Sequence, residues 1–164
     1  MDNPGVRISA KVDYAVRAMA ELAAAPVGGV VRAEDVATAH EVPLAFLLTI
    51  FSDLKTANLV RGHRGRAGGY SLARPSAEIT VADVVRAVEG PLVRVRDVGL
   101  RDLRYTGPAT ALVDVWMAVR TSLRTVLENV TLADLVAGHL PGEISAMAAE
   151  YRAEERKRGR ETPG

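Results

Sequence analysis

The chain has 164 residues, of which 48% are apolar, and a formal net charge of +1, which fits one ordered domain rather than a polycation or a disordered segment. It contains no cysteine, so disulfides, thiolate catalysis and every site with cysteine ligands are excluded. No apolar run approaches the roughly 20 residues that span a bilayer, and residues 1–9 lack the apolar core of a signal peptide, so we expect a cytoplasmic protein.

The first part of the sequence predicts three helices, two of which form a helix-turn-helix. Residues 8–25 place apolar side chains three and four positions apart, and Pro26 ends that helix. A short helix is expected over 33–40, where acidic residues occupy the first turn. Pro43 opens the next helix, over 43–57. A tight connection between these last two helices is typical of a helix-turn-helix. The residues expected to be buried in the 43–57 helix are Leu47, Ile50, Phe51 and Leu54.

A glycine-rich basic loop follows. Residues 61–70 read RGHRGRAGGY and lie between two short runs that favour strands, so they predict a β-hairpin, which is called a wing when it follows a helix-turn-helix. From Lys55 to Arg74 the chain has five Lys or Arg residues and no acidic residue. The loop lacks the Gly-Lys-Ser/Thr of a P-loop and leads into a strand rather than a helix, which argues against a nucleotide-binding enzyme.

The second part predicts a connecting loop, a long helix and a charged tail. Residues 80–90 begin with the capping pattern Thr-x-x-Asp and form a short helix. Residues 93–108 have no clear period and are expected to connect a domain at 1–92 to a segment at 109–140. A second Thr-x-x-Asp pattern starts a short helix at 131–140, and the mixed-charge tail at 141–164 is expected to fray.

The 109–140 segment carries apolar residues at alternating spacings of four and three, as a dimerisation helix does. These residues are Leu112, Trp116, Val119, Leu123, Val126 and Val130. Packing within one subunit would give the same pattern. A single helix-turn-helix with one wing seldom binds DNA tightly alone, which favours a dimer.

Three stretches, KVDYAVRAMAELA, FLLTIFSDLKTANLVRGHRGRAGGYSLARP and EITVADVVRAVEGPL, together resemble the Rrf2 family of bacterial winged-helix regulators, which includes IscR, NsrR and CymR. The likeness covers about residues 6–92, and the helix with the four-and-three spacing fits the dimerisation helix of that family. The resemblance implies a mainly α fold with a small β-hairpin wing, that is, a winged helix-turn-helix followed by a long dimerisation helix. It also implies a homodimeric transcriptional regulator, expected here to be a repressor, that binds double-stranded DNA at a near-palindromic operator.

Two departures from the family pattern bear on function. Cluster-binding members hold iron with cysteines in the loop after the EGPL helix, and residues 93–108 contain none, so we expect no iron–sulfur cluster and no other cofactor. Asp13, which matches a carboxylate ligand of some relatives, is expected to be a surface residue. Relatives often carry Glu-Gln in the recognition helix, where this chain has Leu48 and Thr49. Since Leu48 cannot accept a hydrogen bond from cytosine but could contact a thymine methyl, a different operator preference is expected.

The expected DNA contacts come from the 43–57 helix and the wing. Arg64 and Arg66 at the wing tip would enter the minor groove, where negative potential is concentrated, and three further residues would neutralise phosphates. The full set is Ala45, Leu48, Thr49 and Ser52 in the major groove, Lys55, Arg61 and His63 at phosphates, and Arg64 and Arg66 on the wing. No metal site is expected, because the three histidines lack the spacing of a helical metal pair. His40 and His139 are expected to be helix-end residues.

Other interpretations stay open. The basic loop could be a solvated turn that contacts nothing. The chain could be a protein-interaction module that kept the fold and lost operator recognition, with Leu44 and Leu48 binding a protein instead of DNA. Trp116 could line a pocket for a small-molecule effector, although core packing or a dimer interface is the commoner role of such a residue. No Ser-His-Asp arrangement or pair of carboxylates can be proposed, so enzymatic activity is not expected.

Overall fold

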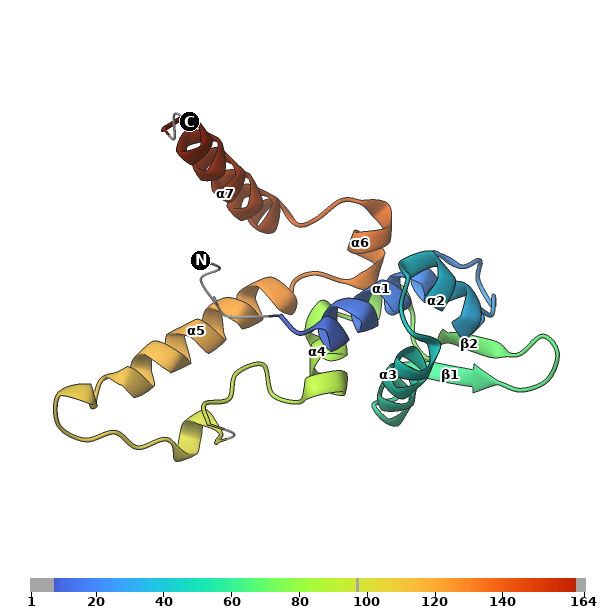
Figure 1. Cartoon of the computed structure of the whole chain (residues 1–164), viewed down its shortest axis with the longest axis horizontal. Helices are drawn as coiled ribbons and strands as arrows, with labels where there is room; N and C mark the ends of the chain where they lie inside the picture. The colour runs from blue at the N-terminus through green and yellow to red at the C-terminus, as the bar shows by residue number, and fades with distance from the viewer. Residues whose placement is uncertain (1–7, 97, 162–164) are drawn as a thin grey trace.

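The structure, a computed structural model, describes residues 8–96 and 98–161, and Figure 1 shows a helical body from which two long helices project. The body begins with α1 (Ala10–Ala24), α2 (Ala33–His40) and α3 (Leu44–Thr56). At the start of α1 the Ser9 hydroxyl accepts a hydrogen bond of 3.2 Å from the Val12 N–H. Lys11 of α1 and Asp53 of α3 form an ion pair of 2.7 Å that joins the two helices.

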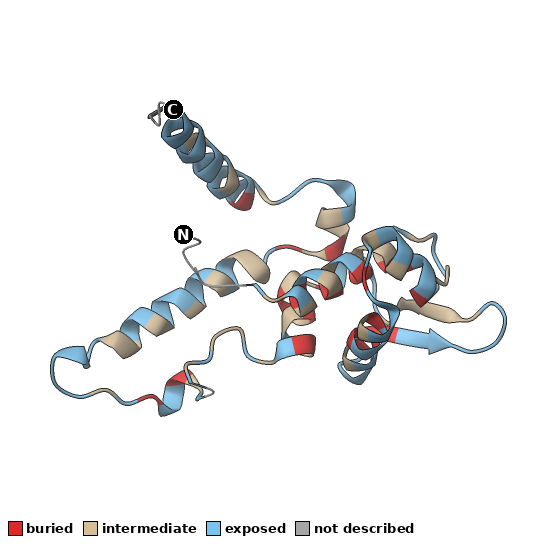
Figure 2. Cartoon of the chain, in the orientation of Figure 1, coloured by how far each residue is buried: buried red, intermediate tan, exposed pale blue. Residues whose placement is uncertain are grey.

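The hydrophobic core lies where α1 and α3 meet α4 (Val81–Glu89). Figure 2 shows buried residues concentrated in this body, whereas the projecting helices are mostly exposed or half-buried. Thr80 and Asp83 form the predicted capping box at the start of α4, because each side chain accepts a hydrogen bond from the other residue's backbone N–H, at 3.1 and 3.0 Å. The predicted stripe of α3 is fully buried: Leu47, Ile50, Phe51 and Leu54.

The predicted hairpin forms a wing of two antiparallel strands, β1 (Val60–His63) and β2 (Gly69–Leu72), with Arg61 opposite Ser71. Val31, which precedes α2, joins this small sheet through two backbone hydrogen bonds with Tyr70, 2.9 and 2.8 Å long. A Cβ on Gly69 would lie 2.4 Å from the Val31 carbonyl oxygen. Only glycine therefore allows this close approach of the two backbones.

The connecting segment has more structure than its sequence predicts. A 3-10 turn, η1 (Ser76–Glu78), precedes α4, and two more, η2 (Leu100–Asp102) and η3 (Gly107–Ala109), lie between α4 and α5 (Leu112–Leu127). Leu100 and Leu103 are buried, and η2 packs against α5. The burial of these two leucines gives the segment apolar packing that its sequence, which has no clear period, does not predict.

The apolar stripe predicted for the dimerisation helix, from Leu112 to Val130, extends beyond the end of α5. α5 ends at Leu127, and Val130 lies beyond it with only 5% of its surface exposed. The Val130 carbonyl accepts a hydrogen bond of 2.9 Å from the Val81 N–H, so this segment has returned to the body. There α6 (Leu132–Ala137) packs against α1. Our assignment of Val130 to the dimerisation stripe is therefore wrong, and the body includes α6 as well as the residues before 92.

The charged tail, which we expected to fray, is helical in the structure and forms α7 (Gly142–Glu161). Among its described side chains only Ile144 is buried, so the helix lacks the apolar period from which a packed helix is predicted. Oppositely charged residues three and four positions apart support it instead, such as Glu155 and Arg158 at 3.5 Å. In the part of the chain that the structure describes, no helix combines the length and apolar character needed to cross a bilayer.

Candidate nucleic-acid interface

The outer face of α3 carries the residues that the sequence assigns to base contacts. Ala45, Leu48, Thr49 and Ser52 are all exposed, because the buried stripe occupies the opposite side of the helix. Leu48 has 43% of its surface exposed, and it is the largest apolar side chain among these four residues. The Thr49 hydroxyl donates a hydrogen bond of 3.2 Å to the Ala45 carbonyl, so its lone pairs are free to accept one from outside.

α3 and the wing border one groove of about 500 Å³, which we call the front groove. The start of α2 forms its third side. Six predicted contacts line it, namely Leu48, Ser52 and Lys55 from α3 and His63, Arg64 and Arg66 from the wing. The helix and the wing therefore face the same space. Ala45 and Thr49 lie on the exposed face of α3 outside this lining.

The front groove is positively charged. Arg32, Lys55, Arg64 and Arg66 line it together with a single carboxylate, that of Glu34. The Arg32 Nε lies 3.6 Å from a Glu34 carboxylate oxygen. This pair is neutral overall, so the charges of Lys55, Arg64 and Arg66 are left unbalanced among the residues that line the groove. A concave surface with this balance attracts a polyanion.

Arg32 is a groove residue that sequence reasoning missed. It occupies the N-cap position of α2 and is exposed. A basic residue before a helix has no pattern that marks it as a binding residue. Its position becomes apparent only in three dimensions, because the neighbouring Val31 pairs with Tyr70 and so brings the start of α2 beside the wing.

An aromatic stack holds the wing against α3. The ring centroids of Phe51 and Tyr70 are 4.0 Å apart and their planes differ by 5°. The Gly62 side of β1 also faces α3, since a Cβ on Gly62 would lie 3.9 Å from the Lys55 Nζ. The orientation of the wing relative to α3 is therefore set by packing at its base.

Arg61 lies on the other face of the wing. Successive residues of a strand point to opposite faces, so Arg61 points away from Gly62 and from α3. It lines a second groove of about 590 Å³ between the wing, the end of α1 and residues 25–29, which we call the rear groove. His63 borders both grooves. The predicted phosphate contacts are thus divided between two faces of the wing.

α5 presents one covered and one uncovered apolar edge. On the covered edge the Trp116 Nε1 donates a hydrogen bond of 3.1 Å to the Tyr105 hydroxyl, beside η2. On the other edge Val115 and Val119 have 50% and 36% of their surfaces exposed, and Val126 continues the same stripe at helical spacing. No residue of α5 is buried in the described chain, so a single subunit leaves this stripe without a partner.

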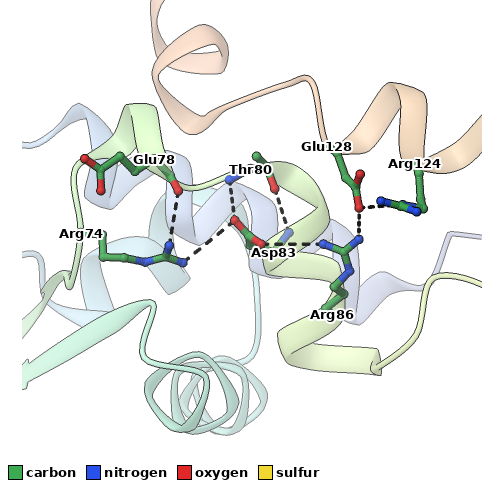
Figure 3. Close-up of polar contacts among 7 residues, drawn as sticks. All are labelled: Arg74, Glu78, Thr80, Asp83, Arg86, Arg124 and Glu128. Atoms are coloured by element: carbon green, nitrogen blue, oxygen red, sulfur yellow. Dashed lines mark hydrogen bonds and ion pairs between the residues drawn. The ribbon is translucent and has the colours of Figure 1, made fainter.

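A chain of ion pairs connects the base of the wing to α5 (Figure 3). Arg74, just after β2, lies 4.0 Å from the Asp83 carboxylate, and Arg86 lies 3.8 Å from the same carboxylate. Arg86 also bonds the Glu128 carboxylate just after α5, which accepts a further bond of 2.9 Å from Arg124. Hydrogen bonds from Arg124 and Arg86 lower the pKa of Glu128 to about 2. These contacts help to fix the direction in which α5 leaves the body.

Together, the buried helix-turn-helix, the wing and the basic front groove define a winged helix-turn-helix protein of the DNA-binding type. Its family follows from comparison with known proteins. The chain belongs to the Rrf2 family, whose profile, described as an iron-dependent transcriptional regulator, matches residues 8–138. It is therefore an HTH-type transcriptional regulator with DNA as its partner rather than an enzyme, as the sequence predicts.

Individual relatives support this assignment. A Mycobacterium tuberculosis protein that bears the name of an HTH-type transcriptional regulator, Rv1287, is 55% identical over 153 residues, which cover 93% of this chain and 95% of the relative. CymR of Bacillus subtilis is 32% identical over 141 residues, covering 86% of this chain and 96% of CymR. The solved structure of that CymR, the global cysteine regulator, superposes with a TM-score of 0.68 at 31% identity over 81% of this chain and 98% of its own. The solved structure of T. potens IscR superposes with a TM-score of 0.66 at 32% identity, covering 82% of this chain and 88% of IscR.

The residues of this chain do not fit an iron–sulfur cluster such as the cluster-binding members of the family hold with cysteines. The sequence has no cysteine, and the described residues contain no group of three or more His, Asp or Glu side chains that could hold a metal ion. Asp13 instead forms an ion pair with Arg17 on the exposed side of α1. His40, at the end of α2, lies 2.9 Å from the Glu21 carboxylate.

Proposed function

We propose that the protein is a sequence-specific repressor that binds a near-palindromic operator as a homodimer, without an iron–sulfur cluster. The observation that supports this most strongly is the front groove, because the exposed face of α3 and the arginines of the wing line one basic space. A repressor needs no further chemistry than this, since occupying a promoter is sufficient to exclude the polymerase.

In this proposal α3 lies in the major groove, whose width of about 12 Å admits a helix. Leu48 contacts a thymine methyl group, and Thr49 and Ser52 exchange hydrogen bonds with base edges. Lys55 neutralises a phosphate and so fixes the register of the helix without reading sequence. Ala45 contributes a small apolar contact next to Thr49.

The wing lies in the adjacent minor groove on the outer side of each half-site. Arg64 and Arg66 approach the floor of that groove, where negative potential is strongest. Gly65 between them has a φ of +95°, a conformation that glycine adopts without strain and that lets the tip turn within the narrow groove.

Dimerisation follows from the uncovered edge of α5. Val115, Val119 and Val126 form an apolar stripe that a second α5 can cover across a twofold axis. The partner's α3 then occupies an equivalent half-site about one helical turn away, ~34 Å along the DNA. Leu112, Trp116 and Leu123 are half-buried beside this stripe and support it from within the subunit.

Genomic capture followed by mobility shifts tests the proposal. We expect discrete palindromic sites, and we expect the double variant Arg64→Ala/Arg66→Ala to lose most affinity for them. Arg101→Ala, which removes an exposed arginine on η2, is the matched control and should bind as the unchanged protein does. Full affinity of the double variant would remove the wing from the mechanism.

A second candidate function is a protein-interaction module on the same fold. It is favoured by Leu44 and Leu48, which expose 37% and 43% of their surfaces on α3. Genomic capture separates the two functions, because a module that no longer reads an operator would recover no discrete sites.

A further inference from the structure

We infer that the rear face of the wing carries a second phosphate-binding site, formed by Arg61, His63 and Ser71, for the DNA backbone that flanks each half-site. The inference rests on the proposed function, since the wing must first be seated in the minor groove. It extends the protein's footprint outward, beyond the base pairs that α3 and the wing tip contact.

The three side chains gather on one face of the hairpin. Arg61 and His63 are two residues apart on β1 and therefore point the same way. Ser71 is the residue opposite Arg61 on β2. The His63 Nε2 and the Ser71 Oγ lie 2.7 Å apart. This hydrogen bond fixes the imidazole and the hydroxyl relative to each other, and both residues line the rear groove together with Arg61.

The positive charge of Arg61 in the rear groove is not balanced by a carboxylate among the residues that the structure describes. No acidic side chain lines the groove, and two arginines do, Arg61 and Arg74. Arg74 is engaged with the Asp83 carboxylate. Within the described chain Arg61 has neither an ion pair nor a side-chain hydrogen bond, whereas arginines such as Arg86 and Arg124 are paired with carboxylates. A guanidinium without a partner beside a hydroxyl and an imidazole is suited to a phosphate oxygen.

The shape of the groove allows a phosphodiester backbone to reach these groups. Its far wall is the turn at residues 25–29, where Val27 is fully exposed and a Cβ on Gly28 would have no neighbour within 4 Å. With a volume of about 590 Å³, the groove is large enough for a phosphate and its sugar. Because this face points away from α3, the DNA that it meets lies outside the half-site, where phosphates are available whatever the sequence.

Two operator duplexes and one pair of variants test the inference. The short duplex ends at the outer edge of each wing contact, and the long duplex extends it by about one helical turn at each end. The unchanged protein should bind the long duplex roughly tenfold more tightly, and the slope of log K against log salt should steepen by about 0.9 for each added phosphate contact. In Arg61→Gln/Ser71→Ala, whose two positions line the rear groove but not the front groove, this advantage should disappear, while affinity for the short duplex stays unchanged. Arg101→Gln is the control for loss of an exposed positive charge and should keep the advantage.

Equal affinity of the unchanged protein for both duplexes would overturn the inference. So would a long-duplex advantage that survives in Arg61→Gln/Ser71→Ala, or binding to both duplexes that is weakened equally in this variant. None of these outcomes would contradict the proposed function. The proposed function fails separately if the unchanged protein binds neither duplex, or if Arg64→Ala/Arg66→Ala binds both duplexes with unchanged affinity. Retained affinity of the rear-face variant for the short duplex also shows that it is folded.

Discussion

At the scale of single residues, Glu128 gives the protein a defined dependence on pH. Its pKa in the folded protein is about 2, against an ordinary value of 4.5, because Arg124 and Arg86 donate hydrogen bonds to its carboxylate. A group whose pKa is lower in the folded than in the unfolded state stabilises the fold fully above its ordinary pKa. This contribution is therefore present above about pH 4.5 and is lost as the pH falls towards 2.

Urea unfolding of Glu128→Gln against the unchanged protein measures this effect. We expect the difference in free energy of unfolding between the two proteins to be largest at pH 6 and to shrink steadily as the pH is lowered through 4 towards 2.5. A difference that stays constant over this range would show that the carboxylate does not depend on its two arginines in the way the structure indicates.

Two glycines of the wing have different roles, and alanine substitution separates them. In Gly69→Ala the new Cβ would lie 2.4 Å from the Val31 carbonyl, so the sheet must open, and we expect a loss of about 3 kcal/mol in the free energy of unfolding. In Gly65→Ala the new Cβ would have no neighbour within 4 Å. Only the positive φ disfavours alanine there, so we expect a loss of about 1 kcal/mol in the free energy of unfolding. Thermal unfolding of the two variants tests this order, and equal losses would contradict it.

At the scale of elements, the stack of Phe51 on Tyr70 holds the wing in line with α3. Tyr70→Ala should cost roughly 2–4 kcal/mol of stability and should weaken operator binding at temperatures where the variant is still folded, because the wing loses its fixed orientation. Tyr151→Ala on α7, which removes an exposed ring, is the matched control. Unchanged operator affinity of folded Tyr70→Ala would show that the wing does not need this support.

Elements could be predicted from sequence where a local signal and burial agree. The α3 stripe and the Thr80 capping box are such cases, since each of the two patterns is contained within a short stretch of sequence. α7 was missed because its helix depends on pairs of surface charges rather than on an apolar face. The end of α5 was misplaced because Val130 continues the four-and-three spacing although it is buried in the body.

The candidate site shows the same division between local and long-range information. Leu48, Arg64 and Arg66 could be assigned from the sequence, because an exposed helix face and a glycine-rich turn are visible in the order of residues. Arg32 could not, since it joins the groove only through the pairing of Val31 with Tyr70. The sequence also could not show that Arg61 and Lys55 lie in different grooves. The face to which a strand residue points is defined only when the register of the hairpin is known.

At the scale of the whole molecule, the proposed dimer depends on the uncovered edge of α5. Val115→Asp/Val119→Asp places two charges in this stripe, and we expect it to convert the protein into a monomer, because burying unpaired carboxylates is strongly unfavourable. Thr121→Asp, on an exposed part of α5 away from the stripe, should remain a dimer. Sedimentation equilibrium distinguishes the two, and a dimeric double variant would place the interface elsewhere.

Loss of the dimer should also reduce operator affinity, since a monomer contacts one half-site whereas the dimer contacts two. If a dimer makes ~6–10 phosphate contacts, its affinity should fall roughly 10³–10⁵-fold between 50 and 200 mM salt. A monomeric variant should show about half that slope in a plot of log K against log salt, because it releases about half as many counterions. Equal slopes for the two would contradict the twofold arrangement.

Hydroxyl-radical footprinting of the captured operator tests most directly whether α3 and the wing act together on twofold-related half-sites. We predict two equivalent protected blocks, one per half-site, each with minor-groove protection beside it that Arg64→Ala/Arg66→Ala abolishes. A single block without a symmetric mate, or minor-groove protection that persists in that variant, would contradict the account.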